Sequence, residues 1–179
     1  MNPTGLVTLK SFTSGDGRVL SASEALKRGL VVLSEPKSKG WKLDSSEVPL
    51  GENLFVDNGR QLLAYCFGGR SPLSDFYISR FGIGTGTTAP ASTNTSLENP
   101  IYFDPPTNSV YTKEVSAIDF PSPYSLRVEF TIGAGDGNGY LITELGLFSG
   151  SGTMVARRTN VGINKTSDFA PQLLWRIRF

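Results

Sequence analysis

The first chemical feature of this sequence is the absence of histidine from all 179 residues. The chain therefore has no Ser-His-Asp or Cys-His catalytic group, no His-ligated zinc or iron and no imidazole general base. Among the remaining carboxylates, the pair worth testing is Glu129 and Glu144, which we expect on neighbouring strands. Both fit the polar faces of half-solvated strands better than a catalytic pair. Cys66 is interpreted as a small buried apolar residue, since no second Cys or His can join it.

Two glycine-rich segments resemble ligand loops without meeting their requirements. The segment 82–87 reads Gly-Ile-Gly-Thr-Gly-Thr, and it lacks both the third glycine of a dinucleotide fingerprint and the Gly-Lys-Ser/Thr of a P-loop. The segment 133–139 offers Asp136 and Asn138 as calcium ligands, which is too few for a site of six to eight oxygens. We therefore expect no metal and no cofactor, and we interpret 133–139 as a long, mobile hairpin tip.

Charge is nearly balanced, with 17 Lys and Arg against 16 Asp and Glu, giving a net charge of +1. No basic field would recruit nucleic acid or an anionic membrane, so neither partner is expected. Four arginines occupy adjacent or alternating strand positions, and they are either sheet-face charges that oppose edge-to-edge aggregation or contacts between subunits. These are Arg157, Arg158, Arg176 and Arg178.

Strict two-residue alternation in the C-terminal half predicts half-buried antiparallel strands. Residues 126–132 place four apolar side chains on one face, and 173–179 repeat the pattern with Trp175 in the core. Residues 140–148 form a third candidate strand, with Leu141, Thr143, Leu145 and Leu147 on one face. Together with 20 Gly and 11 Pro, these strands predict a mainly β protein, an antiparallel β-sandwich with one or two short helices.

The N-terminal residues are interpreted as a separate part of the chain. We expect residues 1–52 to form an arm or small subdomain and residues 53–179 to form the sandwich. A capping box at 21–24 predicts a two-turn helix that ends at Gly29. The apolar run that follows has little visible means of burial within one subunit, so we expect it to contact a neighbouring copy: Leu30, Val31, Val32 and Leu33.

Residues 53–69 are ambiguous between a hairpin and a helix. Asp57-Asn58-Gly59 suits a type I′ turn between two short strands. Alternatively, Asp57 caps a helix that carries Leu62, Leu63 and Cys66 on one face. The adjacent leucines break strand alternation, so the helix is favoured.

Two stretches of the sequence are distinctive: Gly-Thr-Gly-Thr-Thr-Ala-Pro-Ala at 84–91 and Thr-Glu-Leu-Gly-Leu-Phe, an expected strand, at 143–148. With them the sequence resembles structural proteins of tailed bacteriophages. Similar stretches occur in tail, collar, baseplate and fibre-attachment proteins. The resemblance covers about residues 53–179, and the further segments that carry it are 53–60, 78–83, 95–100, 142, 154–158, 165–168 and 175–179.

The resemblance implies a non-enzymatic virion component that forms a homo-oligomer, with copies of itself and other virion proteins as partners. Its expected place is the tail, collar or baseplate, after synthesis in the host cytoplasm. No apolar run long enough for a signal peptide opens the chain, in keeping with that expectation. A capsid decoration protein is the alternative within the same class.

A carbohydrate-binding module that contacts a host receptor is the alternative from another class. Four tyrosines lie near predicted turns, where their rings can stack on sugars or pack at strand ends. They are Tyr102, Tyr111, Tyr124 and Tyr140. A glycan-cleaving enzyme is not expected, because such sites need clustered carboxylates.

Overall fold

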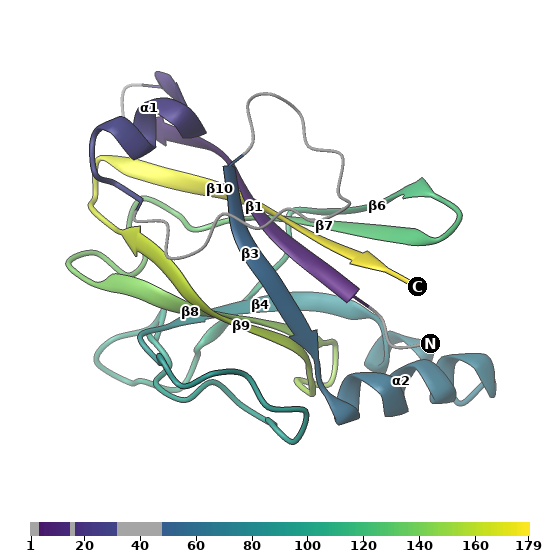
Figure 1. Ribbon diagram of the computed structural model, residues 1–179. Helices are drawn as coiled ribbons and strands as arrows, with labels where there is room; N and C mark the ends of the chain where they lie inside the picture. The colour runs from purple at the N-terminus through teal and green to yellow at the C-terminus, as the bar shows by residue number, and fades with distance from the viewer. Residues whose placement is uncertain (1–3, 15–16, 32–47) are drawn as a thin grey trace.

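The computed structural model describes residues 4–14, 17–31 and 48–179, and its elements are mostly strands (Figure 1). Two α-helices and one 3-10 turn accompany ten strands in this part of the chain. In chain order the elements are β1 (Thr4–Ser14), β2 (Val19–Ser21), α1 (Ala22–Lys27), β3 (Val48–Phe55), α2 (Asp57–Phe67), η1 (Leu73–Asp75), β4 (Ile78–Gly84), β5 (Thr112–Glu114), β6 (Ala117–Ser122), β7 (Ser125–Thr131), β8 (Leu141–Ser149), β9 (Met154–Asn164) and β10 (Phe169–Arg178).

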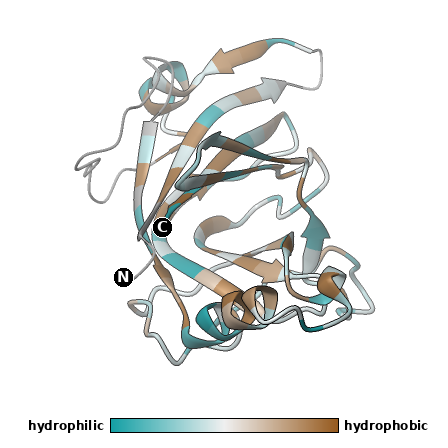
Figure 2. Cartoon of the chain, turned by 90° about the vertical axis from the view of Figure 1, so that its right-hand side faces the viewer, coloured by the Kyte–Doolittle hydropathy of each residue, from teal (hydrophilic) through white to brown (hydrophobic). Residues whose placement is uncertain are grey.

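The strands form one antiparallel sheet in the order β5-β4-β8-β9-β3-β1-β10-β7-β6, with β2 paired to β1. β3 pairs with β1 along one stretch and with β9 at Leu54 and Phe55, so it joins the two halves of the sheet. The sheet curls into a half-barrel, as Figure 2 shows. The predicted mainly β, antiparallel fold with two short helices is confirmed.

The expectation of a separate N-terminal arm is wrong for residues 4–14. β1 lies between β3 and β10, and it pairs with β10 from Thr4 opposite Arg178 to Ser14 opposite Phe169. Leu6, Val7 and Leu9 are fully buried there. The sequence concealed this arrangement because the partner strand lies at the other end of the chain.

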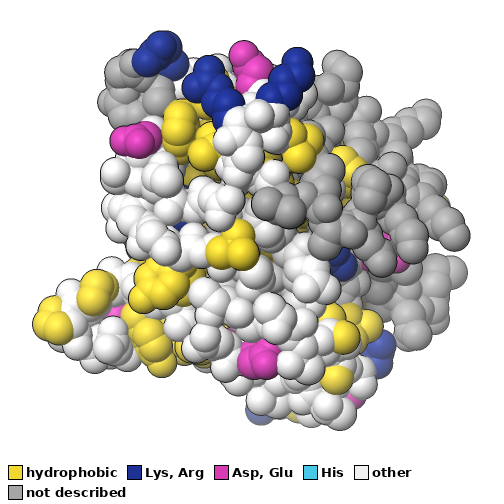
Figure 3. All heavy atoms as spheres, turned by 60° about the vertical axis from the view of Figure 1, so that its left-hand side comes forward, with side chains coloured by type: hydrophobic (Ala, Val, Ile, Leu, Met, Phe, Trp, Pro, Cys, Tyr) yellow, Lys and Arg dark blue, Asp and Glu magenta, His cyan; other side chains and the backbone are white. Residues whose placement is uncertain are grey.

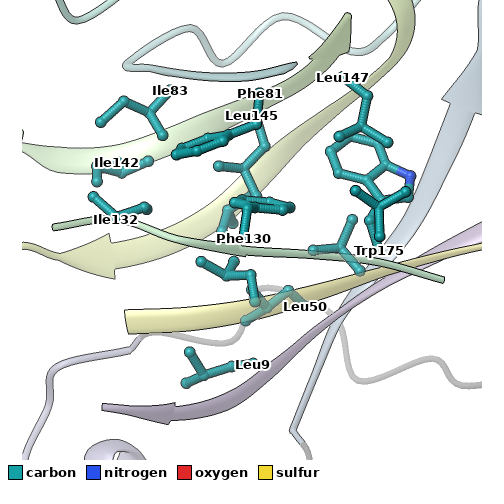
Figure 4. Close-up of a cluster of buried hydrophobic side chains, with 14 of the residues drawn as sticks. Leu9, Leu50, Phe81, Ile83, Phe130, Ile132, Ile142, Leu145, Leu147 and Trp175 are labelled. Atoms are coloured by element: carbon teal, nitrogen blue, oxygen red, sulfur yellow. The ribbon is translucent and has the colours of Figure 1, made fainter. Parts of the chain in front are cut away.

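The core fills the concave side of the curled sheet (Figure 4). Phe81 from β4 stacks on Phe130 from β7 with ring centroids 4.6 Å apart, and Phe130 in turn packs against Trp175 from β10. Trp175 is fully buried, as its alternation predicts. The Phe81–Phe130 pair connects β4 and β7, which are not neighbours in the sheet, so the two halves share one core.

β8 differs from its predicted facing at its first residues. The pairing with β9 shifts between Ile142 and Glu144, which is a bulge. Ile142 joins Leu145 and Leu147 in the core, whereas Leu141 is 46 % exposed. Between the pairs at Ile142 and Glu144, β8 advances by two residues and β9 by four, and simple alternation cannot anticipate such an irregularity.

Both predicted helices are present, but the N-cap of the second is Val56 and not the predicted Asp57. Ser21 and Glu24 form the capping box of α1. α2 is a helix and not a hairpin, with Val56 as the N-cap and Asp57 as its first residue. Gly59 lets α2 approach β9, because a Cβ there would lie 2.4 Å from the Val155 carbonyl oxygen.

The segment 133–139 is not a hairpin tip. β7 pairs with β6 and β10, whereas β8 pairs with β4 and β9, so this segment crosses from one half of the sheet to the other. Its position next to the loop after β4 creates one of the two surface hollows described below.

Candidate functional site

Glu144 is the most unusual polar residue of the described chain, because its carboxylate is fully buried. Oε1 accepts hydrogen bonds from the Arg157 Nε at 2.7 Å and the Glu98 backbone N–H at 2.8 Å. Oε2 accepts from the backbone N–H groups of Asn99 at 3.2 Å and Gly86 at 3.3 Å. Two bonds to each oxygen fill the roughly four acceptor positions of a carboxylate.

Arg157 completes this buried cluster from β9. Its side chain is 2 % exposed, and its remaining nitrogens reach Asn94 Oδ1 at 3.0 Å and Glu98 Oε2 at 3.2 Å. Hydrogen bonds from the Thr88 hydroxyl and backbone N–H, helped by Arg157, hold the pKa of Glu98 below its usual range. The cluster thus ties the loop 85–99 to β8 and β9 near both of its ends.

Glycines permit this approach of loop and strand. A Cβ on Gly84 or Gly86 would lie 2.6 or 2.5 Å from Glu144 Oε2. Thr143 adds a hydrogen bond from its hydroxyl to the Gly86 carbonyl oxygen. The two stretches that carry the bacteriophage resemblance, at 84–91 and 143–148, therefore meet in one hydrogen-bonded cluster.

The expected placement of Glu129 and Glu144 on neighbouring strands is wrong. Glu129 lies on β7, which is not adjacent to β8, and it contacts Lys10 and Gln172. Glu144 is engaged by four donors, as described above. The structure does not bring these two carboxylates together.

The residues predicted to contact another subunit have mixed placements. Val31 is 3 % exposed and bridges to Ile163, and Leu30 is partly buried and packs against the core. Val32 and Leu33 lie outside the described residues. The burial of Val31 leaves its side chain no surface for the predicted contact with a neighbouring copy, whereas the contact of Leu30 stays a prediction.

The arginines are mostly engaged inside the chain. Arg157 is buried in the Glu144 cluster, which contradicts its predicted contact with another subunit. Arg158 donates to the carbonyl oxygens of Leu50 and Glu52, and Arg176 is 9 % exposed and reaches Thr8. Arg178 is exposed at the end of β10.

An apolar groove of about 240 Å³ lies between α2 and the β6–β7 hairpin, two elements that Figure 1 places at its right. Its floor includes the buried side chains of Phe55, Leu62 and Val155. Four of the eleven exposed large hydrophobic side chains of the described residues line it: Tyr77, Ile118, Phe120 and Phe179. The sequence analysis missed Ile118 and Phe120, although their two-residue spacing just before Pro121 was a visible signal.

A second hollow is a cleft of about 400 Å³ between the loop after β4 and the segment between β7 and β8. It is lined by Thr85, Asn99, Pro100, Ile101, Tyr102, Phe103, Pro105, Asn108, Gly135, Asp136, Gly137, Asn138 and Tyr140. The left-hand side of Figure 1 comes forward in Figure 3, and most side chains on that face are neutral. We name this hollow the polar cleft.

Cations behind the polar cleft fix its acidic and amide side chains. Asp136 accepts from Lys113 Nζ at 2.6 Å and from the Gly133 N–H at 3.0 Å. Asn138 Oδ1 accepts from Lys165 Nζ at 2.8 Å. Burial lowers the pKa of Lys165, against the opposing effect of Asp136 and Asp168.

The four predicted tyrosines separate into three places. Tyr102 and Tyr140 line the polar cleft. Tyr111 lies behind Tyr102, edge-on to it and to the buried Phe148. Tyr124 is 71 % exposed at the β6–β7 turn, beside the groove.

No cluster of three or more acidic or cysteine side chains able to hold a metal occurs among the described residues. Neither described helix is long and apolar enough to cross a membrane. No protein-family model, no curated protein and no solved structure matches this chain.

Proposed function

We propose that this chain is a non-enzymatic structural component of a bacteriophage virion that assembles as a homo-oligomer in the tail, collar or baseplate. The sequence resemblance over residues 53–179 supports the virion class. The observation that carries the assembly role is the apolar groove between α2 and the β6–β7 turn. Large exposed apolar areas on a folded protein mark surfaces that another molecule covers.

The dimensions and chemistry of the groove favour a protein partner over a small ligand. Its volume of about 240 Å³ is below the roughly 300–1,000 Å³ of typical ligand clefts, and its lining is almost entirely apolar. A symmetric interface requires one patch to carry both a hollow and a projection. Phe67, next to the lining residue Cys66, projects with 88 % exposure, so the same patch supplies both.

The Glu144 cluster supports a role without catalysis. A general base needs an acceptor position that a substrate can reach, and the four donors to Glu144 leave none. Its contacts instead hold a loop against the sheet. A rigid surface of this kind suits assembly, since little order has to be gained on association.

The assembly surface is tested by Phe120→Glu, which places a charge at the rim of the groove. The matched control is Val19→Glu, because Val19 is similarly exposed, at 64 % against 75 %, but lies on β2 outside the groove. We expect sedimentation velocity to show oligomers for the unmodified chain and for Val19→Glu, and monomers for Phe120→Glu. Unchanged oligomers in Phe120→Glu would contradict the surface, and a monomeric unmodified chain would contradict homo-oligomer formation.

The place in the virion is tested separately by immunogold labelling of phage particles that carry the chain. Labelled tails, collars or baseplates are the expected outcome. Labelling over the head would favour the capsid decoration alternative, and particles without label would remove both.

A further inference from the structure

The polar cleft offers a combination of side chains that the assembly role does not use. Tyr140 is 52 % exposed at the wall of the cleft, and Tyr102 is held from behind by Tyr111, which packs in turn on the buried Phe148. Aromatic faces contribute contact area at little cost in side-chain entropy, because their rings have only two rotatable angles. The cleft therefore presents two rings, one of them fixed before any ligand arrives.

The polar groups of the cleft are also fixed in advance. Lys113 and the Gly133 N–H each donate to one Asp136 oxygen, and the Asp136 side chain is 12 % exposed. Asn138 accepts from Lys165 and donates one amide hydrogen to the Ala134 carbonyl. Each Asp136 oxygen keeps one further acceptor position, and the Asn138 amide keeps one further donor.

The charge of the lining selects among ligand classes. The described lining residues include neither Lys nor Arg, and the charge of Asp136 is paired with Lys113 behind the wall, so no cation of the lining is placed to bind a phosphate or another anion. The volume of about 400 Å³ lies within the range of ligand clefts. A neutral molecule with an apolar ring face and several hydroxyls can pack on the tyrosine rings, donate to the Asp136 oxygens and accept from the Asn138 amide.

We propose that the polar cleft binds a neutral saccharide, with its ring face on Tyr140 or Tyr102 and its hydroxyls on Asp136 and Asn138. The site is distinct from the assembly groove. Leu141, next to Tyr140, pairs with Asn164 at the end of β9, whereas the groove residue Val155 lies at the start of β9. Val155 lies opposite Leu147 and Phe148, six to seven residues along β8 from Leu141, which corresponds to about 20 Å, so each surface can be altered without touching the other.

The test measures binding of four disaccharides by saturation-transfer NMR: maltose, cellobiose, lactose and di-N-acetylchitobiose. Adenosine serves as a neutral aromatic ligand that is not a simple saccharide. An array of bacterial O-polysaccharides, tested with the same protein, distinguishes a surface glycan from a free sugar as the source. The expected result is binding of at least one saccharide probe in either arm.

Three variants locate the binding. Tyr140→Ala removes a ring, and Gly135→Leu adds a side chain at the cleft wall, where a Cβ meets nothing within 4 Å. Each should weaken binding by about tenfold or more. Tyr124→Ala is the matched control, an exposed tyrosine outside the cleft, and should leave affinity unchanged within about twofold.

Thermal melts of the three variants verify that each is folded. The proposal is overturned if no saccharide probe binds in either arm, if only adenosine binds, or if Tyr124→Ala reduces binding as much as the cleft variants do. Loss of affinity in Tyr140→Ala alone, with Gly135→Leu unaffected, would also place the saccharide elsewhere.

Discussion

At the scale of single residues, Glu144 is the buried charge on which the loop 85–99 depends. Replacing one partner of a buried ion pair leaves the other uncompensated, which typically costs about 3–5 kcal/mol. Glu144→Gln keeps the shape but turns an amide N–H₂ toward groups that also donate. We expect the free energy of unfolding in urea to fall by about that amount.

The control for this substitution is Glu114→Gln, because Glu114 is exposed on the short strand β5. Its effect should stay within about 0.5 kcal/mol. A double variant with Arg157→Met should lose less than the sum of the two single losses, since both residues belong to one network. Additive losses would mean that Glu144 and Arg157 act independently.

A glycine in the same cluster gives the second residue-scale prediction. Gly86→Ala would place a Cβ 2.5 Å from Glu144 Oε2 and 2.7 Å from Glu98 Oε2. Strain of this kind should lower the free energy of unfolding by about 1–3 kcal/mol. Gly135→Ala is the matched control, because its Cβ meets nothing within 4 Å. Equal melting temperatures for the two variants would refute the close approach.

At the scale of elements, the loop 104–110 is organised by one carboxylate. Asp104 accepts hydrogen bonds from the hydroxyls of Ser109 and Thr107 and from the backbone N–H groups of Val110 and Ser109, which lower its pKa below the ordinary 3.8. A lowered carboxylate pKa adds stability above the ordinary value, and this stability is lost as the pH falls toward the lowered pKa.

The corresponding variant is Asp104→Asn, which keeps an acceptor but removes the charge. The difference in melting temperature between it and the unmodified chain should be largest near about pH 6 and should shrink below about pH 4. Amide exchange of Val110 should be faster in the variant at the higher pH. A difference that stays constant down to about pH 2 would show that ionisation of Asp104 contributes nothing.

Elements differ in how much of them the sequence reveals. Alternation alone predicts β7 and β10, because each has one face in the core and the two strands pair with each other in unbroken register. The facing of Leu141 was mispredicted because a bulge depends on the partner strand. Glu144 looked like a surface carboxylate for a related reason, since the backbone N–H groups that donate to it belong to a loop more than forty residues earlier in the chain.

The two hollows were equally hidden. Tyr102 and Tyr140 were recognised as a type of residue that binds sugars, but nothing local says that they line one cleft while Tyr124 lies elsewhere. Long-range pairing decides such placement, and a single sequence does not display it.

At the scale of the whole molecule, β3 and the stacked rings of Phe81 and Phe130 make one cooperative unit of the two halves. Leu9→Ala on β1 and Leu147→Ala on β8 remove fully buried side chains from opposite halves, each at a cost of about 2–5 kcal/mol. We expect each variant to lower the midpoint of a single urea transition.

Far-ultraviolet circular dichroism and tryptophan fluorescence should report the same midpoint for each variant, as two-state unfolding requires. Val19→Ala, at an exposed position on β2, serves as the control and should leave the midpoint nearly unchanged. Separate transitions for the two halves would contradict a shared core.

The pairing of β1 with β10 also bears on how the chain is made. During synthesis β1 emerges first, and its partner strand is the last of the described elements to be translated. Until β10 has been translated, β1 lacks this partner, and its apolar residues can bind other nascent chains or a chaperone. The pair of β1 and β10 can close only once β10 has left the ribosome, so the sheet has a slow, non-local closing step.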